Sequence, residues 1–212
     1  MSKLVLYDYW RSSASYRVRI ALALKGLEYE RVPVDLAAGA QKAEGYREVN
    51  PQGFVPALDV GGGVRIVQSL AIIDWIEAVH TDPPLLPADP VDRAHVMALA
   101  LAVACDIHPL NNLRVLKHLG GTLGLNEGAR ADWYRHWVRE GLAGLEALAA
   151  PRAGRFLFGD TPTLADICLV PQMYNARRFD VPTSDFPLLA AVDEACNALE
   201  PFAAAHPDRV AQ

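Results

Sequence analysis

A cluster of small hydroxyl side chains follows the first apolar segment of the chain. Ser12, Ser13 and Ser15 supply hydroxyl groups and backbone N–H donors where a strand-like segment gives way to a helical pattern. Because the N-terminal end of a helix carries a partial positive charge, such a cluster favours binding of an anion. Arg11 and Arg17 add positive charge. On this segment alone, serine capping with solvated arginines explains the residues equally well.

The surroundings of these serines exclude several common chemistries. No G-x-S-x-G surrounds them, as a hydrolase nucleophile requires, and no P-loop or G-x-G-x-x-G follows the preceding strand candidate. Cys105, Cys168 and Cys196 form no C-x-x-C pair and are expected to be buried free thiols. Cys105 and His108 have the spacing of half a metal site, but no second ligand pair accompanies them, so no metal is expected.

Two further segments carry signals for binding a peptide or an anion. Val55-Pro56 begins a strand candidate, where a cis bond would free the Val55 N–H and C=O to pair with an extended peptide. A trans proline on an edge strand is the alternative. Gln68-Ser69 precedes a helical pattern, so Ser69 is the expected N-cap and a second candidate anion site. Each signal is weak alone, whereas their order along one unit is specific.

The hydrophobic pattern of the first 80 residues predicts the elements that position these side chains. The predicted strands cover residues 3–9, 29–34, 55–60 and 64–67, and the predicted helices cover residues 16–25 and 69–80. Gly26 ends the first helix, and three consecutive glycines after residue 60 suit a hairpin. The order βαβ followed by ββα indicates a mixed sheet with helices packed on it.

Strand signals disappear in the second part of the chain. A proline-rich linker over residues 83–89 separates a domain at residues 1–82 from a domain at residues 90–212. The predicted helices of the second domain cover residues 91–119, 127–150, 163–175 and 187–205. Thr163 and Asp166 resemble a capping box, which favours a structural role for Asp166 over a catalytic one. The fold class is α/β plus all-α.

Composition limits the classes of function. The 212 residues are 51% hydrophobic with a net charge of −5, which excludes global disorder and argues against a nucleic-acid or anionic-membrane partner. The N-terminal segment meets Asp8 too early for a signal-peptide core. No uncharged apolar run approaches the ~20 residues that cross a membrane. A soluble, cytoplasmic protein is expected.

The chain resembles the zeta class of glutathione transferases, and within it the bacterial maleylacetoacetate isomerases, over nearly its whole length. The resemblance rests on S-S-A-S-Y-R-V-R-I-A-L at 12–22, N-P-Q at 50–52, V-P-A-L at 55–58, Q-S-L-A-I-I at 68–73, H-P-L-N-N-L-R at 108–114 and G-D-T-P-T-L-A-D at 159–166. It implies a thioredoxin-like domain that binds glutathione as cofactor, an all-helical domain that completes the substrate pocket, and a homodimer.

The resemblance also assigns site residues. It implies that Ser12, with Ser13 beside it, activates the glutathione thiol. The implied glutathione contacts are Ser12, Ser13, Ala14, Ser15, Tyr16, Arg17, Gln41, Val55, Pro56, Gln68, Ser69, His108, Asn112, Leu113 and Arg114. Arg11 and Arg178 are the expected contacts for a small dicarboxylate substrate. Where this chain has Ala14 the family often has a cysteine, so redox side activities are in more doubt than isomerisation.

The implied reaction is the cis–trans isomerisation of maleylacetoacetate to fumarylacetoacetate in tyrosine and phenylalanine catabolism. Maleylpyruvate isomerisation in gentisate degradation is the nearest alternative, and Leu113, where that branch can have arginine, favours maleylacetoacetate. A transferase proper or a dehalogenase of α-halo acids would use the same serine. A non-catalytic binding or structural protein is disfavoured because Arg11, Ser12, Val55-Pro56 and Gln68-Ser69 occur together.

Overall fold

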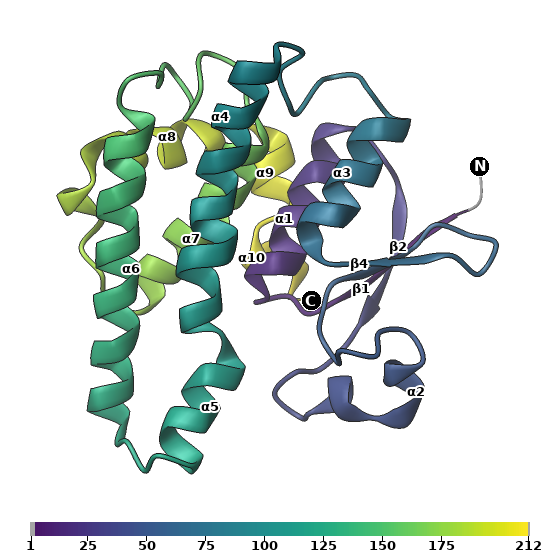
Figure 1. Cartoon of the computed structure of the whole chain (residues 1–212). Helices are drawn as coiled ribbons and strands as arrows, with labels where there is room; N and C mark the ends of the chain where they lie inside the picture. Colours follow the sequence, from purple (N-terminus) through teal and green to yellow (C-terminus); the bar gives the residue numbers. More distant parts are fainter. Residues whose placement is uncertain (1–2, 212) are drawn as a thin grey trace. The chain divides into compact units, whose positions relative to one another are not determined.

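The computed structural model describes residues 3–211, which divide into two compact units (Figure 1). The first unit comprises the chain up to Pro84 together with the segment that starts at Leu199, and the second comprises Leu85–Ala198. The sequence instead predicted one helical domain over residues 90–212. The difference arises because side chains of the first helix bind carbonyl groups of the C-terminal segment.

A four-stranded sheet forms the centre of the first unit. Its strands are β1 (Leu4–Asp8), β2 (Tyr29–Pro33), β3 (Ala57–Asp59) and β4 (Arg65–Val67), in the order β2-β1-β3-β4. β1 runs parallel to β2 and antiparallel to β3, which is antiparallel to β4. The mixed sheet expected from the sequence is therefore present, and the side chains of Leu6 and Leu58 on its central strands are fully buried.

Helices pack on this sheet and on one another. The first unit contains α1 (Ser13–Leu24), a 3-10 turn (Ala40–Lys42), α2 (Glu44–Arg47), α3 (Ser69–Val79), α9 (Glu200–Ala204) and α10 (Pro207–Val210). α1 contacts both α3 and α9, as Figure 1 shows. α1 begins three residues earlier than predicted because Ser12 caps it. It ends as predicted, with Gly26 at φ 64°.

The second unit consists of helices and short turns. Its elements are α4 (Pro90–Leu101), a π-helical turn (Ala102–Ile107), a 3-10 turn (His108–Asn111), α5 (Leu113–Gly121), α6 (Glu127–Ala149), α7 (Leu164–Arg178), a 3-10 turn (Thr183–Asp185) and α8 (Pro187–Asn197). Thr163 and Asp166 form the capping box that the sequence predicts at the start of α7.

Two predicted helices of this region are interrupted. The helix expected over residues 91–119 passes through the π-helical and 3-10 turns, at the point where Ile107 packs on Gly141 of α6. A Cβ at Gly141 would lie 2.3 Å from Ile107 Cγ1, so the close approach needs glycine. The helix expected over residues 187–205 ends at Asn197. A separate helix then starts with Pro201 in its first turn, where proline lacks only an N–H that has no intrahelical acceptor.

Pro90–Gly121, taken as one helical run, has the length and mean hydropathy of a membrane-crossing helix, with 33% of its most apolar window buried. Core helices of soluble proteins meet the same criterion. The cysteines are all free, and Cys168 and Cys196 are buried as predicted. Cys105 is exposed, which corrects that expectation: the buried residues of the π-helical turn are Val103 and Ile107.

Candidate functional site

Ser12 occupies the turn between β1 and α1 and is the N-cap of α1. Its backbone N–H donates to the Tyr9 carbonyl at 2.8 Å, which closes the turn. Its Oγ accepts the Ser15 N–H at 3.3 Å. Because Oγ acts as acceptor in the cap, the hydroxyl proton remains available for a ligand atom at the helix N-terminus. The Ser15 hydroxyl is fully buried and has no hydrogen-bond partner among the described residues.

The N-terminus of α3 differs from the sequence prediction by one residue. Gln68, and not Ser69, is the N-cap, and it makes no side-chain cap hydrogen bond. The backbone of Gln68 has φ 73° and ψ 121°, a left-handed conformation that costs a non-glycine residue of order 1 kcal/mol or more. Its side chain donates to Gln52 Oε1 at 2.8 Å. The first N–H groups of α3 are thus left without a side-chain acceptor from the cap.

Arg17 links the two helix starts. It lies on α1 with 2% of its surface exposed, and its Nη1 donates to Ser69 Oγ at 3.4 Å. Its Nε and Nη2 are buried, and no described residue accepts a hydrogen bond from them. A buried guanidinium without an acceptor is costly, so these donors point to an anionic ligand. Arg17 and Ser69 are therefore a candidate anion site.

The loop before β3 is shaped by local hydrogen bonds. Asn50 donates through Nδ2 to the Phe54 carbonyl at 2.8 Å and accepts the Gln52 N–H at 3.0 Å. These bonds build the predicted turn and lead into Val55-Pro56, whose peptide bond is cis. A Cβ at Gly53 would lie 2.8 Å from the Gln41 carbonyl, so glycine lets the two loops approach. Gln41 Oε1 is buried without a partner among the described residues, and it can accept a ligand N–H.

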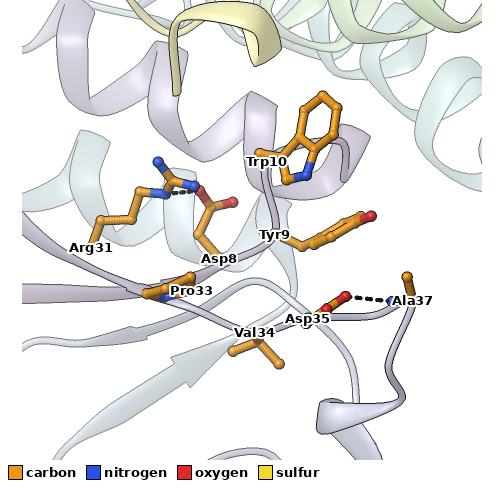
Figure 2. A pocket seen from close by; sticks show the side chains of 8 residues that line it. All are labelled: Asp8, Tyr9, Trp10, Arg31, Pro33, Val34, Asp35 and Ala37. Atoms are coloured by element: carbon orange, nitrogen blue, oxygen red, sulfur yellow. Dashed lines mark hydrogen bonds and ion pairs between the residues drawn. The ribbon is translucent and has the colours of Figure 1, made fainter. Parts of the chain in front are cut away.

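A cavity of about 340 Å³ opens where β1 and β2 end, as Figure 2 shows. Its lining residues are Asp8, Tyr9, Trp10, Arg31, Pro33, Val34, Asp35 and Ala37. Arg11 follows this lining directly, and its guanidinium lies 4.6 Å from the centroid of the Trp10 ring and 3.1 Å from the Tyr9 hydroxyl. Arg11 is exposed, so these ring contacts orient its charge while leaving it accessible to a substrate.

A buried ion cluster supports the turn that carries Ser12. The Asp8 carboxylate, fully buried at the end of β1, lies 2.8 Å from Arg19 Nη1 and 2.8 Å from Arg31 Nε. Burial lowers the pKa of the Arg19 guanidinium from its ordinary value, and the charge of Asp8 opposes that effect. Arg19 also donates to the Trp10 carbonyl. This cluster was missed by sequence reasoning, which treated the second arginine of R-V-R-I-A-L only as part of a motif.

The other candidates on α1 have separate surroundings. Ser13 is buried in the first turn, and the small side chain of Ala14 is partly exposed. The ring of Tyr16 is buried, and its hydroxyl lies 3.5 Å from the Phe202 carbonyl. The Tyr16 side chain therefore faces the C-terminal segment. The glutathione contact expected at Tyr16 stays a prediction, and the backbone is the part of this residue that could make it.

In the helical unit, the candidates of the H-P-L-N-N-L-R run bracket the start of α5. His108 begins the 3-10 turn and is partly exposed. Asn112 is the N-cap of α5, and its Oδ1 accepts the Arg114 N–H at 3.1 Å. Leu113 is 42% exposed, and the Arg114 side chain is exposed as well. An exposed leucine here offers an apolar surface where an arginine would offer charge.

Arg178 ends α7 and is held by local contacts. Its Nη1 donates to Asn175 Oδ1 at 3.2 Å, and its guanidinium lies over the rings of Tyr174 and Phe179 at 5.7 and 5.6 Å. The side chain is exposed and therefore accessible to a carboxylate. Arg177, next to it, pairs instead with Asp193 at 2.5 Å, so the two neighbouring arginines have different roles.

The chain matches family models in both of its units. Family models for the N-terminal and C-terminal domains of glutathione S-transferase match residues 11–79 and 127–204. The chain belongs to the glutathione S-transferase family. The maleylacetoacetate isomerase of Rhizobium meliloti strain 1021 is 53% identical over 206 residues, which cover 97% of this chain and 96% of that protein.

Solved structures place the chain within the zeta class of this glutathione S-transferase family. The holo structure of a maleylpyruvate isomerase, described as a bacterial glutathione S-transferase of the zeta class, has a TM-score of 0.94, 48% identity and 97% coverage of each chain. A maleylacetoacetate isomerase from Methylobacterium extorquens AM1, with bound malonate and glutathione, has a TM-score of 0.94, 42% identity and 97% coverage of each chain. The predicted fold, a thioredoxin-like unit with a helical unit, is confirmed.

Proposed function

We propose that this glutathione S-transferase family protein is a glutathione-dependent cis–trans isomerase that converts maleylacetoacetate to fumarylacetoacetate. The observation that carries the proposal is the Ser12 cap, whose hydroxyl proton is available at the N-terminus of α1. The identity of 53% to a maleylacetoacetate isomerase supports the reaction and substrate. The reaction would then belong to tyrosine and phenylalanine catabolism.

The described residues fit glutathione. Arg17 and Ser69 offer buried donors for the carboxylate of its γ-glutamyl group. The extended segment at the cis Val55-Pro56 bond suits its cysteinyl backbone, and the unpartnered Gln41 Oε1 suits a peptide N–H. Gln68, held by Gln52, keeps the start of α3 in place beside this anion site. The relative from Methylobacterium extorquens, which binds glutathione, supports the same cofactor here.

Glutathione supplies a thiolate that adds reversibly to an activated alkene, so that rotation occurs about a single bond. The chain must keep that sulfur ionised near neutral pH, although a free thiol has a pKa of about 8.5. The Ser12 hydroxyl donates a hydrogen bond to the sulfur, and the N–H groups at the start of α1 add a favourable field. The hydroxyls of Ser13 and Ser15 lie in the same turn and strengthen that field.

The substrate has two carboxylates, which call for two cations. Arg11, stacked on Trp10, and Arg178, stacked on Phe179, are exposed guanidinium groups in rigid aromatic settings. Guanidinium groups pair with carboxylates through two parallel hydrogen bonds, so each of these arginines is a candidate contact for a carboxylate of the substrate. The malonate bound to the Methylobacterium extorquens relative is also a dicarboxylate, and it supports this substrate class.

Maleylpyruvate is the second candidate substrate. The holo structure with a TM-score of 0.94 is that of a maleylpyruvate isomerase, which supports the same chemistry on a smaller dicarboxylate. Leu113 favours maleylacetoacetate over maleylpyruvate. The maleylpyruvate branch can have arginine at this position, whereas this chain has an exposed, uncharged leucine at the start of α5. Transfer of glutathione to other electrophiles, including dehalogenation of α-halo acids, would use the same Ser12 site.

An isomerase assay tests the proposal. The rate of isomerisation is measured on maleylacetoacetate and on maleylpyruvate, with and without glutathione, for the unmodified protein and for Ser12→Ala. The proposal expects glutathione-dependent turnover, a preference for maleylacetoacetate and a loss of about tenfold near neutral pH in Ser12→Ala. A preference for maleylpyruvate moves the protein to the second candidate, and turnover of neither substrate rules out isomerisation.

The location and assembly of the protein complete the proposal. A soluble cytoplasmic enzyme suits the small polar substrate and the free cysteines. A homodimer is supported by apolar side chains exposed on α4, namely Val91 and Leu101. Sedimentation equilibrium of the purified protein would give about twice the chain mass of 23.1 kDa for a dimer, and the chain mass itself would reject it.

A further inference from the structure

The C-terminal segment, residues 199–211, belongs to the N-terminal unit although it is last in the chain. Phe202 is fully buried, and its carbonyl lies 3.5 Å from the Tyr16 hydroxyl on α1. The His206 ring packs edge-on against the Tyr16 ring, with centroids 6.1 Å apart. The Val210 carbonyl accepts a hydrogen bond from Arg31 of β2. The segment is thus fixed to α1 and to the edge of the sheet at several points.

Arg19 connects this segment to the turn that carries Ser12. Its Nε donates to the Ala205 carbonyl at 3.1 Å, its Nη1 to Asp8 Oδ1 at 2.8 Å, and its Nη2 to the Trp10 carbonyl at 3.0 Å. Three sides of one planar guanidinium therefore hold three segments: the end of β1, the turn, and the C-terminal segment. Figure 2 shows Asp8 and Trp10 on either side of Tyr9 in this turn.

Trp10 lies inside the turn that ends at Ser12, because the Ser12 N–H donates to the Tyr9 carbonyl. A displaced Trp10 carbonyl therefore displaces the cap hydroxyl. We infer that the C-terminal segment positions Ser12 for catalysis. Arg19 is the positioning residue, because it binds both this segment and the turn that carries Ser12. The inference rests on the proposed function of Ser12, and it adds that the last thirteen described residues are needed for the chemistry as well as for the fold.

The test measures the pKa of glutathione bound to the whole protein, from its thiolate ultraviolet absorbance as a function of pH. Ser12→Ala sets the scale and is expected to raise that pKa by about one unit, the worth of one hydrogen bond to the charged sulfur. Arg19→Lys keeps the charge beside Asp8 but cannot reach three acceptors, and it is expected to raise the pKa by about half a unit. Lysine in place of arginine leaves the buried carboxylate paired.

The double variant distinguishes positioning from a general loss of structure. If Arg19 acts through Ser12, adding Arg19→Lys to Ser12→Ala raises the thiol pKa no further, because the hydroxyl is already absent. Arg177→Lys is the matched control: it makes the same substitution beside the buried Asp193 in the other unit, and it should leave the thiol pKa unchanged. Additive shifts in the double variant would overturn the inference.

A second variant keeps the test decisive if Arg19→Lys does not fold. Phe202→Leu leaves every guanidinium in place and weakens the packing of the buried Phe202 side chain, which anchors the C-terminal segment. It should therefore also raise the thiol pKa. An unchanged pKa in Arg19→Lys, or in Phe202→Leu where the first variant is unfolded, overturns the inference and leaves the proposed function standing. An unchanged pKa in Ser12→Ala overturns both.

Discussion

Arg17 and Arg19 lie two positions apart on α1, and both are buried, with 2% and 1% of their surfaces exposed. The region around Arg19 is complete: Asp8, the Trp10 carbonyl and the Ala205 carbonyl accept from all three of its nitrogen atoms. The region around Arg17 is incomplete, since only Ser69 accepts from it among the described residues. The two arginines are equally buried, but they differ in how many of their N–H donors have an acceptor in the protein.

The contrast follows from the cost of burying charge. A buried guanidinium with a carboxylate and carbonyl acceptors repays much of its desolvation, whereas one without acceptors does not. The protein keeps Arg17 buried despite this cost, which we attribute to the carboxylate of glutathione. In our proposal, Arg19 stabilises the turn that carries Ser12, and Arg17 binds the ligand.

The largest expected effect is on stability, in Arg19→Met. Removing this guanidinium leaves Asp8 buried with only Arg31 beside it, and breaking a buried pair in this way costs about 3–5 kcal/mol. Urea unfolding, followed by circular dichroism, measures the free energy of unfolding. A loss below about 1 kcal/mol would remove the distinction between the two arginines.

Ser12→Ala is expected to lower turnover near neutral pH by about tenfold, because a rise of about one unit in the thiol pKa lowers the ionised fraction by at most that factor. It also removes the side-chain cap of α1, which costs about 1 kcal/mol of stability. A raised thiol pKa moves the acid limb of the pH profile of kcat/KM to higher pH, since the thiolate is the reactive form. Steady-state kinetics across pH measures both effects. Ser13→Ala is the comparison variant, and an equal loss there would show that the turn has no single activating hydroxyl.

Arg17→Met tests the arginine that lacks acceptors in the protein. It removes a charge that lacks protein acceptors, so the free energy of unfolding should stay the same or rise, while affinity for glutathione falls by about 10- to 100-fold. Isothermal titration calorimetry gives the dissociation constant. A large loss of stability with unchanged affinity would assign Arg17 to the fold.

Arg178→Ala extends the comparison to an exposed arginine. Arg178 rests on Phe179 and donates to Asn175, so its loss should leave stability within about 0.5 kcal/mol. The KM for the dicarboxylate should rise about tenfold through the lost carboxylate pairing. Arg177→Ala is the comparison variant: it removes the same charge one position away, together with the pair to Asp193, and it should leave the KM unchanged. A change confined to glutathione affinity would contradict a substrate role for Arg178.

Much of this architecture could be predicted because it depends on local pattern. The strands, the end of α1 at Gly26 and the capping box at Asp166 follow from periodicity and from residues a few positions apart. The break in the long helix near Ile107 has one local signal, Pro109, which has no N–H for an α-helical hydrogen bond. The close approach of Ile107 to Gly141, 34 positions later, shows only in the fold. The serines and Val55-Pro56 were found by motif.

The role of Arg19 required the fold, because its acceptors come from Asp8, Trp10 and Ala205, which are scattered along the chain. The donors of Arg17 required it as well, since only packing shows which nitrogen atoms lack an acceptor. The sequence places both arginines in a helical pattern, and the structure shows that they are buried and what each one binds.

The most direct measurement is the pKa of the thiol of glutathione bound to the unmodified protein, read from thiolate absorbance across pH. A site made of the Ser12 hydroxyl, the start of α1 and the Arg17 anion pocket lowers that pKa well below the value of about 8.5 for a free thiol. A bound thiol that titrates like free glutathione would contradict the central claim that this unit binds the cofactor and activates it.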